Sequence, residues 1–531
     1  MQTSTAAAAA RILADAGIRR VFGLPGGEVL VLMDELRCAG VDFVLMRHEA
    51  NAGLAAAVHG KLLRQPGVVL TTLGPGAANL MLPMANAYLD LEPLLAISAD
   101  IPEDFPRAHT HQRLPLHDVY RPIARYVENI SAANVYDVVP RALARCMERP
   151  YGVSYLTLST REALEPAVGK AATAVAAGRV SRTGARGHAD ALVTALRGAA
   201  RPLVIIGLGF DTANAERLRR WLTEWNLPVA VTPKVKGVVD ETTADFVGVV
   251  GGMAADGVLC EAIAAADLVV GFGLDPVEVD KTWHAERTIH WLLESPNAGG
   301  IVPAGTELVD HAALLDAVVG QMPPRGWSSP FKEFQDRRKR LLAGAAGSSG
   351  TMWPGDIVTA LASVMPADTI VTTDVGSHKY LFGQYWPSRN PDTFWMSNGL
   401  SGMAYGLSAA IGAKLARRES RVLAAVGDGG FSMNAQELET AKRVDAPFIT
   451  VVLEDGSYSL IKISQANKKL PPYRTEFGPI DTVRMAEACG MEAMRTSDPD
   501  HLAAAAKRAV VQDRSLVIAV PIDADDYTRM F

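Results

Sequence analysis

Short apolar runs bounded by glycine, proline or aspartate recur along this chain between longer stretches with helical periodicity. The strands of a parallel sheet are buried on both faces, so in a sequence they read as uninterrupted apolar runs separated by helices. The candidate strands fall into three groups. The first is Phe43–Met46, Val68–Thr72, Leu94–Ser98 and Ser154–Leu158; the second is Leu203–Gly207, Val229–Thr232 and Leu268–Phe272; the third is Ile370–Thr373, Val422–Val426, Ile449–Leu453 and Leu516–Val520. The pattern predicts an α/β protein with three doubly wound parallel sheets.

The length of the chain supports the same division. At 531 residues it is too long for one hydrophobic core, and about three domains of ordinary size are expected. Two stretches rich in small residues, Pro166–Gly187 and Met322–Gly350, separate the strand groups and are interpreted as linkers. The predicted domains are therefore residues 1–165, 188–320 and 351–531. The first and third domains are alike in the spacing of their strands, and the sequence leaves open whether they are related units.

Charge and cysteine content exclude several classes of function. The net charge is −6 and neither sign forms a long block, so neither a nucleic-acid partner nor a membrane surface is expected. The four cysteines lie far apart and form no metal-binding spacing, which argues against a disulfide framework or a structural zinc. No signal peptide and no long apolar stretch is found. A cytoplasmic protein that acts on small molecules is expected.

The strongest chemical signal follows the candidate strand Val422–Val426. The sequence Gly427–Gly430 comes directly after it, and Asp455 comes just after the next strand, Ile449–Leu453. Small residues let a diphosphate approach the backbone, the N–H groups of a helix bind its oxygens, and Asp428 with Asp455 supplies ligands for a hard cation. The alternative is a tight glycine turn followed by an unrelated acidic loop. Because the two aspartates follow neighbouring strands, a metal–diphosphate site is favoured.

This segment resembles the diphosphate-binding signature of thiamine diphosphate enzymes, and other segments resemble that family in the same order along the chain. Arg47–Ala50 is similar to the stretch that carries the family's catalytic glutamate, and Thr71–Asn79 is similar to its Gly-Pro-Gly loop. Val375–His378 and Ser397–Met403 are similar to two further cofactor-contacting stretches. The resemblance spans nearly the whole chain. It implies a pyrimidine-binding, a middle and a diphosphate-binding domain, with thiamine diphosphate and Mg²⁺ as cofactors.

The resemblance also implies a role for each matching residue. Glu49 would exchange a proton with the pyrimidine ring of the cofactor, and Met403 would bend the cofactor. Asp428, Asp455 and the backbone carbonyl of Ser457 would bind the metal ion. The other implied cofactor-binding residues are Gly76, Asn79, Gly376, Ser377, His378, Ser401, Gly427, Gly429, Gly430 and Tyr458.

Several of these residues have a plain structural alternative. A glutamate such as Glu49 after a strand is often a stabilising charge at a helix N-terminus. Met403 could be an ordinary core residue, and His378 a surface histidine. Glu454 departs from the family pattern, in which an amide residue is common at this position.

Within the superfamily, the closest resemblance is to the acetohydroxyacid synthases, and especially to the catabolic acetolactate synthases. It is carried by Phe22–Gly27, by Thr110–Gln112 with Tyr120–Ile123, and by Gly430–Leu438. Asp455 also stands where catabolic enzymes can carry aspartate instead of asparagine.

This closer resemblance implies the residues around the substrate. Gln112 and His111 would face the reacting carbonyl, with the backbone of Gly27 nearby, although both side chains could equally be solvated polar groups. Leu460 and Ile461 would shape the substrate pocket.

The implied reaction is decarboxylation of a 2-oxo acid, pyruvate or a relative, followed by ligation of the fragment to a second carbonyl. Simple decarboxylases of the family carry a His-His pair or a histidine in the Gly-Pro-Gly loop. Here Thr110 separates His109 from His111 and the loop carries Leu73-Gly74, which favours ligation. A non-ligating decarboxylase and a catalytically silent homologue that binds cofactor or a partner remain the alternatives.

The resemblance bears on cofactors and assembly as well. Gly271–Glu278 is similar to the catabolic pattern rather than to the Arg-rich FAD-binding stretch of the anabolic synthases, so FAD is not expected. A homodimer or homotetramer is expected, in which the first domain of one chain and the third domain of its partner form each active site.

Overall fold

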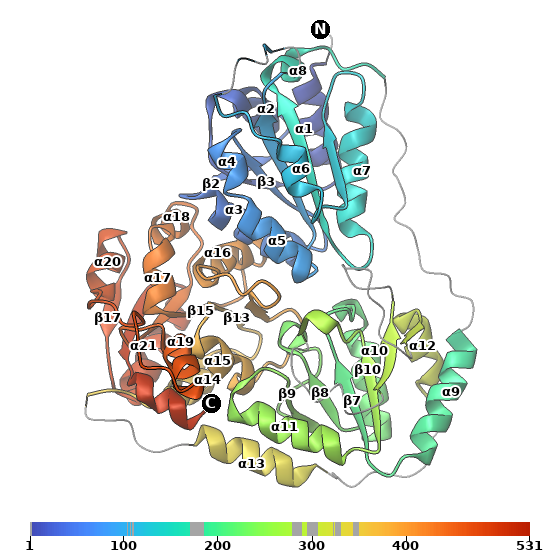
Figure 1. The fold of residues 1–531 in the computed structure, drawn as a ribbon, viewed down its shortest axis with the longest axis vertical. Coiled ribbons are helices and arrows are strands. Elements are labelled where there is room, and N and C mark those ends of the chain that lie inside the picture. Colours follow the sequence, from blue (N-terminus) through green and yellow to red (C-terminus); the bar gives the residue numbers. More distant parts are fainter. Residues whose placement is uncertain are drawn as a thin grey trace. The chain divides into compact units, whose positions relative to one another are not determined.

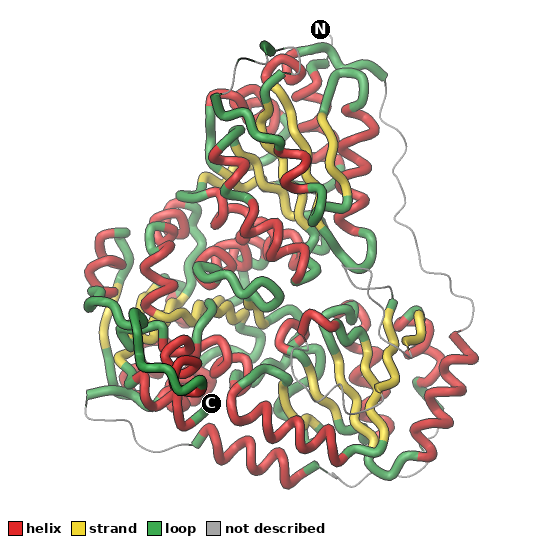
Figure 2. The backbone as a smooth tube through the Cα atoms, viewed as in Figure 1, coloured by secondary structure: helices red, strands yellow, loops and turns green. Residues whose placement is uncertain are grey.

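A computed structural model describes residues 3–102, 105–106, 108, 111–169, 185–278, 289–294, 306–321, 323, 331–343 and 350–531. These residues form three six-stranded sheets, and every strand pairs in parallel with its neighbours. Figure 2 shows each group of strands flanked by helices. The α/β fold class with three parallel sheets is confirmed.

The first sheet is built from residues near the N-terminus. Its strands, in spatial order, are β2 (Asp42–Leu45), β1 (Arg20–Gly23), β3 (Gly67–Thr71), β4 (Leu94–Asp100), β6 (Val153–Ser159) and β5 (Tyr126–Asn129). Its helices are α1 (Thr5–Asp15), α2 (Leu30–Cys38), α3 (Glu49–Leu62), α4 (Pro75–Ala78), α5 (Met81–Leu89), α6 (Leu116–Tyr120), α7 (Val135–Met147) and α8 (Thr160–Leu164), with a 3₁₀ turn η1 (Gly27–Val29). In β3 and β6 every residue is buried, as expected for strands covered on both faces.

The second sheet carries the middle part of the chain. Its order is β12 (Thr306–Leu308), β11 (Ile289–Leu293), β10 (Leu268–Phe272), β7 (Pro202–Ile206), β8 (Val229–Val231) and β9 (Phe246–Val249). The helices are α9 (Ala185–Gly198), α10 (Ala215–Trp225), α11 (Met253–Ala265), α12 (His311–Val318) and α13 (Lys332–Leu342), with 3₁₀ turns η2 (Thr212–Asn214), η3 (Pro233–Val235) and η4 (Pro276–Glu278).

The third sheet is formed by the C-terminal part of the chain. Its order is β14 (Phe394–Met396), β13 (Ile370–Thr373), β15 (Val422–Gly427), β16 (Ile449–Glu454), β18 (Leu516–Pro521) and β17 (Ala493–Arg495). The helices are α14 (Pro354–Val364), α15 (Ser377–Tyr385), α16 (Gly406–Ala416), α17 (Asp428–Asn434), α18 (Glu437–Arg443), α19 (Ser459–Asn467), α20 (Thr482–Ala488) and α21 (Pro499–Gln512), with a 3₁₀ helix η6 (Ala524–Arg529).

The first and third sheets share one topology. Numbered within its own sheet, each has the strand order 2-1-3-4-6-5. The similar spacing of strands in the two segments therefore reflects the same path of the chain. In both sheets the order reverses beside the first strand of the sheet, and ligands of open α/β sheets bind at such switch points, outside the carboxyl ends of the strands.

All the candidate strands are present, each within two residues of its expected ends. The interpretation of Met322–Gly350 as a linker is wrong in part, because α13 lies within it (Figure 1). Gln335 in this helix donates hydrogen bonds to the carbonyls of Ala244 and Phe246, both at 2.7 Å. The helix has no buried residue of its own, so the sequence lacks the apolar stripe that would reveal it.

The chain forms two compact units. One combines Met1–Arg179 with Ile411–Arg418 and Glu439–Ala446, and thus holds the first sheet. The other comprises Val180–Ala410, Glu419–Leu438 and Pro447–Phe531, and holds the second and third sheets. Among the residues described above, no helix is both long and apolar enough to cross a membrane.

Candidate active site

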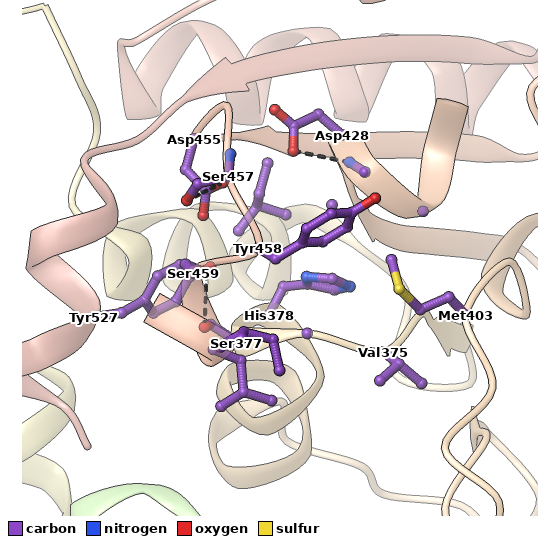
Figure 3. A pocket seen from close by; sticks show the side chains of 17 residues that line it. Val375, Ser377, His378, Met403, Asp428, Asp455, Ser457, Tyr458, Ser459 and Tyr527 are labelled. Atoms are coloured by element: carbon purple, nitrogen blue, oxygen red, sulfur yellow. Dashed lines mark hydrogen bonds between the residues drawn. The ribbon is translucent and has the colours of Figure 1, made fainter. Parts of the chain in front are cut away.

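A cavity in the second unit lies at the carboxyl ends of β13, β15 and β16 (Figure 3). The switch point of the third sheet falls between β13 and β15, where α/β folds place their ligands. The lining residues are Val375, Gly376, Ser377, His378, Met403, Gly427, Asp428, Gly429, Gly430, Leu453, Asp455, Ser457, Tyr458, Ser459, Leu460, Ile461 and Tyr527. The structure thus gathers the predicted residues of four separate segments around one space.

Three helices begin at this cavity. Ser377, Asp428 and Ser459 are the first residues of α15, α17 and α19, and all three line it. The first N–H groups of a helix have no partner within the helix and carry a partial positive charge. The Ser377 and Ser459 hydroxyls lie 2.9 Å apart and tie two of these termini together. This arrangement favours a multiply charged anion such as a diphosphate.

Two carboxylates face the same cavity. Asp428 accepts the N–H groups of Gly429 and Gly456, both at 2.9 Å, and Asp455 accepts the N–H of Ser457 at 2.9 Å. Burial, followed by the charge of Asp455, raises the pKa of Asp428 to about 7. Burial also raises the pKa of Asp455. Two carboxylates held together in a partly buried space are suited to a divalent cation.

The rest of a metal shell has to come from other oxygens. In the described part of the chain, no three His, Cys, Asp or Glu side chains gather closely enough to hold a metal by themselves. Ser457, on the same loop as Asp455, also lines the cavity, as the predicted carbonyl ligand would require. A cation bound by Asp428 and Asp455 would therefore take further ligands from backbone and from the bound anion, which fits a metal–diphosphate group.

His378 is a buried residue, so the alternative of a surface histidine is wrong. It is 6% exposed, and burial lowers its pKa to about 3, so the ring is neutral. A Cβ atom on Gly427 would lie 2.9 Å from the His378 Cε1 atom, and one on Gly376 would lie 2.7 Å from it. Gly376 also has φ +152°. Because these two glycines have no side chains, the His378 ring can pack directly against their backbone at the wall of the cavity.

The segment that carries Ser401 and Met403 is held by a residue that the sequence interpretation missed. Asp374 is 1% exposed and accepts the N–H groups of Ala404 at 3.0 Å and Tyr405 at 3.3 Å. Burial raises the pKa of Asp374 to about 6. The position of Asp374 after β13, one residue before Val375, is the signal that could have revealed it.

Ser401 and Met403 occupy different places in this segment. Ser401 has φ +54°, donates to the Asn398 carbonyl at 2.9 Å and accepts a hydrogen bond from Lys379 at 3.1 Å. Ser401 is exposed, whereas Met403 is half-buried and lines the cavity. Met403 is therefore not a fully buried core methionine.

The start of α19 forms one wall of the cavity. The Tyr458 ring packs against Phe477 with 5.3 Å between centroids, and Leu460 and Ile461 follow it. Ile461 is 53% exposed within this chain. Leu460 also lines a second cavity of about 500 Å³ in the same unit, together with Ser401, Asn398 and Gly252. Tyr527 of η6 completes the first cavity and was not anticipated from the sequence.

Glu49 lies in the first unit as the first residue of α3, after a short turn that follows the end of β2 at Leu45. Its carboxylate accepts a hydrogen bond from the side-chain amide of Asn79 at 3.0 Å. A Cβ atom on Gly76 would lie 3.4 Å from Glu49 Oε1, so the Gly-Pro-Gly loop packs closely on this carboxylate. The corner between β2 and α3 is braced by Arg47, which pairs with Glu439 at 2.7 Å.

Gln112 meets the same loop. Gly74 has φ +58°, and a Cβ atom there would lie 2.9 Å from the Gln112 Cβ. Gln112 and His111 are both exposed within this chain. Among the described residues outside its own turn, none has an atom within 4 Å of a Cβ built on Gly27. His109 and Thr110 lie outside the described residues. The structure brings Glu49, Gly76, Asn79 and Gln112 together, while His111 and Gly27 are left open to solvent in this chain.

Comparison with known proteins agrees with this geometry. Residues 3–119 match the family described as thiamine pyrophosphate enzyme, N-terminal TPP binding domain; residues 189–317 match its central domain, and residues 374–520 its C-terminal TPP binding domain. Together the three matches span most of the chain.

Similar proteins include several acetolactate synthases. The acetolactate synthase of Bacillus subtilis (strain 168) is 29% identical over 97% of this chain and 92% of its own length. The catabolic acetolactate synthase of Raoultella terrigena is 28% identical over 96% of this chain and 93% of its own. The large subunit of acetolactate synthase isozyme 2 of Escherichia coli (strain K12) is 27% identical over 96% and 93%. The chain belongs to the thiamine pyrophosphate enzyme family and carries the N-terminal, central and C-terminal domains of that family in order.

Proposed function

We propose that this protein is a thiamine diphosphate and Mg²⁺ dependent carboligase of the acetolactate synthase type. It would decarboxylate a 2-oxo acid, pyruvate or a relative, and join the remaining fragment to a second carbonyl. The observation that carries the proposal is the meeting of three helix N-termini with two carboxylates in one cavity. The acetolactate synthases to which the chain is similar over nearly its whole length support it further.

The cavity residues suit the diphosphate end of the cofactor. Asp428, Asp455 and the Ser457 carbonyl would hold Mg²⁺, and the N-termini of α15 and α17 would bind the diphosphate oxygens. Neutral, buried His378 packs closely against the backbone of Gly376 and Gly427. The group held here supplies an electron sink for carbon dioxide loss when it is bound.

Glu49 would perform the proton exchange at the pyrimidine end. A carboxylate held by the Asn79 amide keeps a fixed orientation, which a proton transfer to a ring nitrogen requires. Gly76 permits the close approach of the loop to this carboxylate, and Gln112 beside Gly74 is suited to face the substrate carbonyl. His111 and the Gly27 backbone are proposed to lie near the same carbonyl.

Ligation needs room for a second carbonyl compound. The second cavity, of about 500 Å³, adjoins the first at Leu460 and is of a size that admits a small acceptor. Leu460 and Ile461 would shape the passage between them. The absence of a His-His pair in the sequence supports ligation over protonation of the fragment.

We infer that FAD is not a cofactor, because a carboxylate lies at the edge of the second sheet where a dinucleotide phosphate would bind. Glu278 is buried, and its carboxylate accepts the N–H of Leu208 at 2.6 Å and the hydroxyl of Thr232 at 2.7 Å. These groups follow β7 and β8, at the sheet edge where α/β domains bind dinucleotide phosphates. A carboxylate in that place repels a phosphate.

The assembly is proposed to be a homodimer or homotetramer in the cytoplasm, with no nucleic-acid or membrane partner. Each active site would combine the first domain of one chain with the third domain of its partner, since Glu49 and Asp428 belong to different domains. The predicted boundaries at residues 1–165, 188–320 and 351–531 remain part of this proposal.

The test is a donor and acceptor screen of the purified protein with thiamine diphosphate and Mg²⁺. Pyruvate and aromatic 2-oxo acids are supplied one at a time, carbon dioxide release is followed, and products are identified by mass spectrometry. The proposal expects carbon dioxide release together with a ligated hydroxyketone product. Aldehyde alone would indicate the non-ligating decarboxylase, and no release from any 2-oxo acid, with cofactor bound, would indicate the silent homologue. Asp428→Ala serves as the control that removes the metal ligand.

A further inference from the structure

Tyr527 is a buried tyrosine whose hydroxyl has no hydrogen bond to any described residue. It belongs to η6 and is 1% exposed. Among the residues that the structure describes, nothing lies in hydrogen-bonding position for its hydroxyl. An unpaired polar atom in a protein interior is unfavourable and rare, so it calls for an explanation.

Tyr527 belongs to the wall of the cavity at the candidate metal–diphosphate site. Tyr527 lines this cavity together with Asp428, Asp455 and Ser457 (Figure 3). Burial raises the pKa of Tyr527, and the charges of Asp455 and Asp428 raise it further. The phenol is therefore a neutral donor near two carboxylates, and it bonds to neither of them.

The 3₁₀ helix that carries Tyr527 is anchored to the elements that build the cavity. The N–H of Ile522 bonds to the Glu454 carbonyl at 3.0 Å, at the end of β16. Asp525 lies 3.6 Å from Lys462 of α19, and Met530 is buried. The ring is thus fixed relative to Asp455, on the loop between β16 and α19.

We propose that the Tyr527 hydroxyl donates a hydrogen bond to an oxygen of the metal-bound diphosphate, and that Tyr527 is a cofactor-binding residue. This inference rests on the proposed function, because that function places a diphosphate in this cavity. The diphosphate would bring acceptor oxygens to a donor that has no acceptor among the residues with described structure. Hydrogen bonds to an anionic oxygen are shorter and stronger than those between neutral groups.

A second tyrosine provides a matched control. Tyr385 is buried, and its hydroxyl also has no hydrogen-bond partner among the described residues. It lines neither of the two cavities. If Tyr527 served only to fill space, Tyr527→Phe and Tyr385→Phe would behave alike.

The experiment compares wild type, Tyr527→Phe and Tyr385→Phe by calorimetric titration with thiamine diphosphate and with inorganic pyrophosphate, each in the presence of Mg²⁺. We expect Tyr527→Phe to bind both ligands about tenfold more weakly, as loss of a hydrogen bond to a charged group predicts. Tyr385→Phe should bind both as wild type does. Without ligand, Tyr527→Phe should melt at the wild-type temperature or above it, because the substitution removes an unpaired buried hydroxyl.

Two outcomes overturn the inference. One is wild-type affinity of Tyr527→Phe for both ligands. The other is a melting temperature of ligand-free Tyr527→Phe well below that of wild type, which would mean that the Tyr527 hydroxyl already has a hydrogen-bond partner in the ligand-free protein. Failure of the wild-type protein itself to bind either ligand would overturn the proposed function instead, so the two failures are distinguishable.

Discussion

At the residue scale, Asp374 shows how one side chain positions a segment that is proposed to bind the cofactor without being part of it. Its carboxylate accepts N–H groups from Val375, Ala404 and Tyr405, and so joins the end of β13 to the segment that carries Met403. A carboxylate is an acceptor only, whereas an amide presents one N–H₂ group that would face these donors.

We therefore predict that Asp374→Asn lowers both the stability and the cofactor affinity of the protein. The loss of one or two of these hydrogen bonds should reduce the free energy of unfolding by about 1–3 kcal/mol. Urea unfolding and titration with thiamine diphosphate and Mg²⁺ measure the two effects. Wild-type values in both would show that Asp374 does not hold the segment of Ser401 and Met403.

The sequence anticipates some of these residues and misses others for a physical reason. Asp428 and Asp455 were predicted together because each follows a strand, and the carboxyl ends of parallel strands share one edge of the sheet. Tyr527 lies 72 positions after Asp455 and reaches the cavity only through the packing of η6. No feature of the local sequence around Tyr527 predicts this packing. The contact between His378 and Gly427 could not be predicted for the same reason, because it arises from tertiary structure and not from the spacing of residues in the sequence.

At the element scale, the strands that the sequence interpretation missed are mostly those at sheet edges. β5, β12 and β17 are edge strands with exposed or half-buried residues, so they lack the continuous apolar run of an inner strand. β1 lies within the first sheet but has only four residues and begins with Arg20. α13 was missed because charged residues predominate in its sequence and none of its residues is buried. Apolar periodicity thus reveals long buried runs. It misses exposed edge strands, charged helices and short strands such as β9 and β14, although both of these strands are buried.

The segment after β8 contains a buried ion pair that makes the stability of the second unit sensitive to the loss of either partner. Lys236 and Glu241 are both buried with 2.5 Å between Nζ and Oε2, and Lys236 also donates to the Trp386 carbonyl at 2.9 Å. Removing one partner leaves the other charge unpaired in a medium of low polarity. Lys236→Met should therefore lower the free energy of unfolding by about 3–5 kcal/mol, measured by urea unfolding of the ligand-free protein.

A double variant separates charge from packing in this prediction. When Lys236→Met is combined with Glu241→Gln the buried charge is absent, while the new side-chain amide oxygen can still accept the Gly237 N–H that Glu241 accepts at 3.1 Å. Most of the lost stability should return. A double variant as unstable as Lys236→Met alone would mean that the loss comes from packing of the lysine side chain.

At the scale of the whole molecule, the first and third sheets repeat one strand order, and each carries one end of the proposed active site. Two domains of the same topology, one with Glu49 and one with Asp428, are suited to pair across a two-fold axis of a dimer. We predict that mixing inactive Glu49→Gln chains with inactive Asp428→Ala chains restores activity. In a mixed dimer, one site would carry both changes and the other neither.

The size of the recovery follows from symmetry. With random exchange about half of the dimers are mixed, and about a quarter of wild-type sites should be intact. Subunit exchange is followed with chains that carry different affinity tags. If the chains exchange and no activity returns, each active site lies within one chain.

The central claim is that this protein activates thiamine diphosphate, with Glu49 as the residue that exchanges the proton at the pyrimidine ring. The most direct measurement is the rate of hydrogen–deuterium exchange at C2 of the bound cofactor, by quenched-flow and proton magnetic resonance, in wild type and Glu49→Gln. Glutamine retains the shape of the side chain and cannot take up the proton. We predict rapid exchange in wild type and a loss of at least about a hundredfold in Glu49→Gln, within the range for removal of a general acid–base group. Equal rates in the two proteins, with cofactor bound in both, would contradict the account.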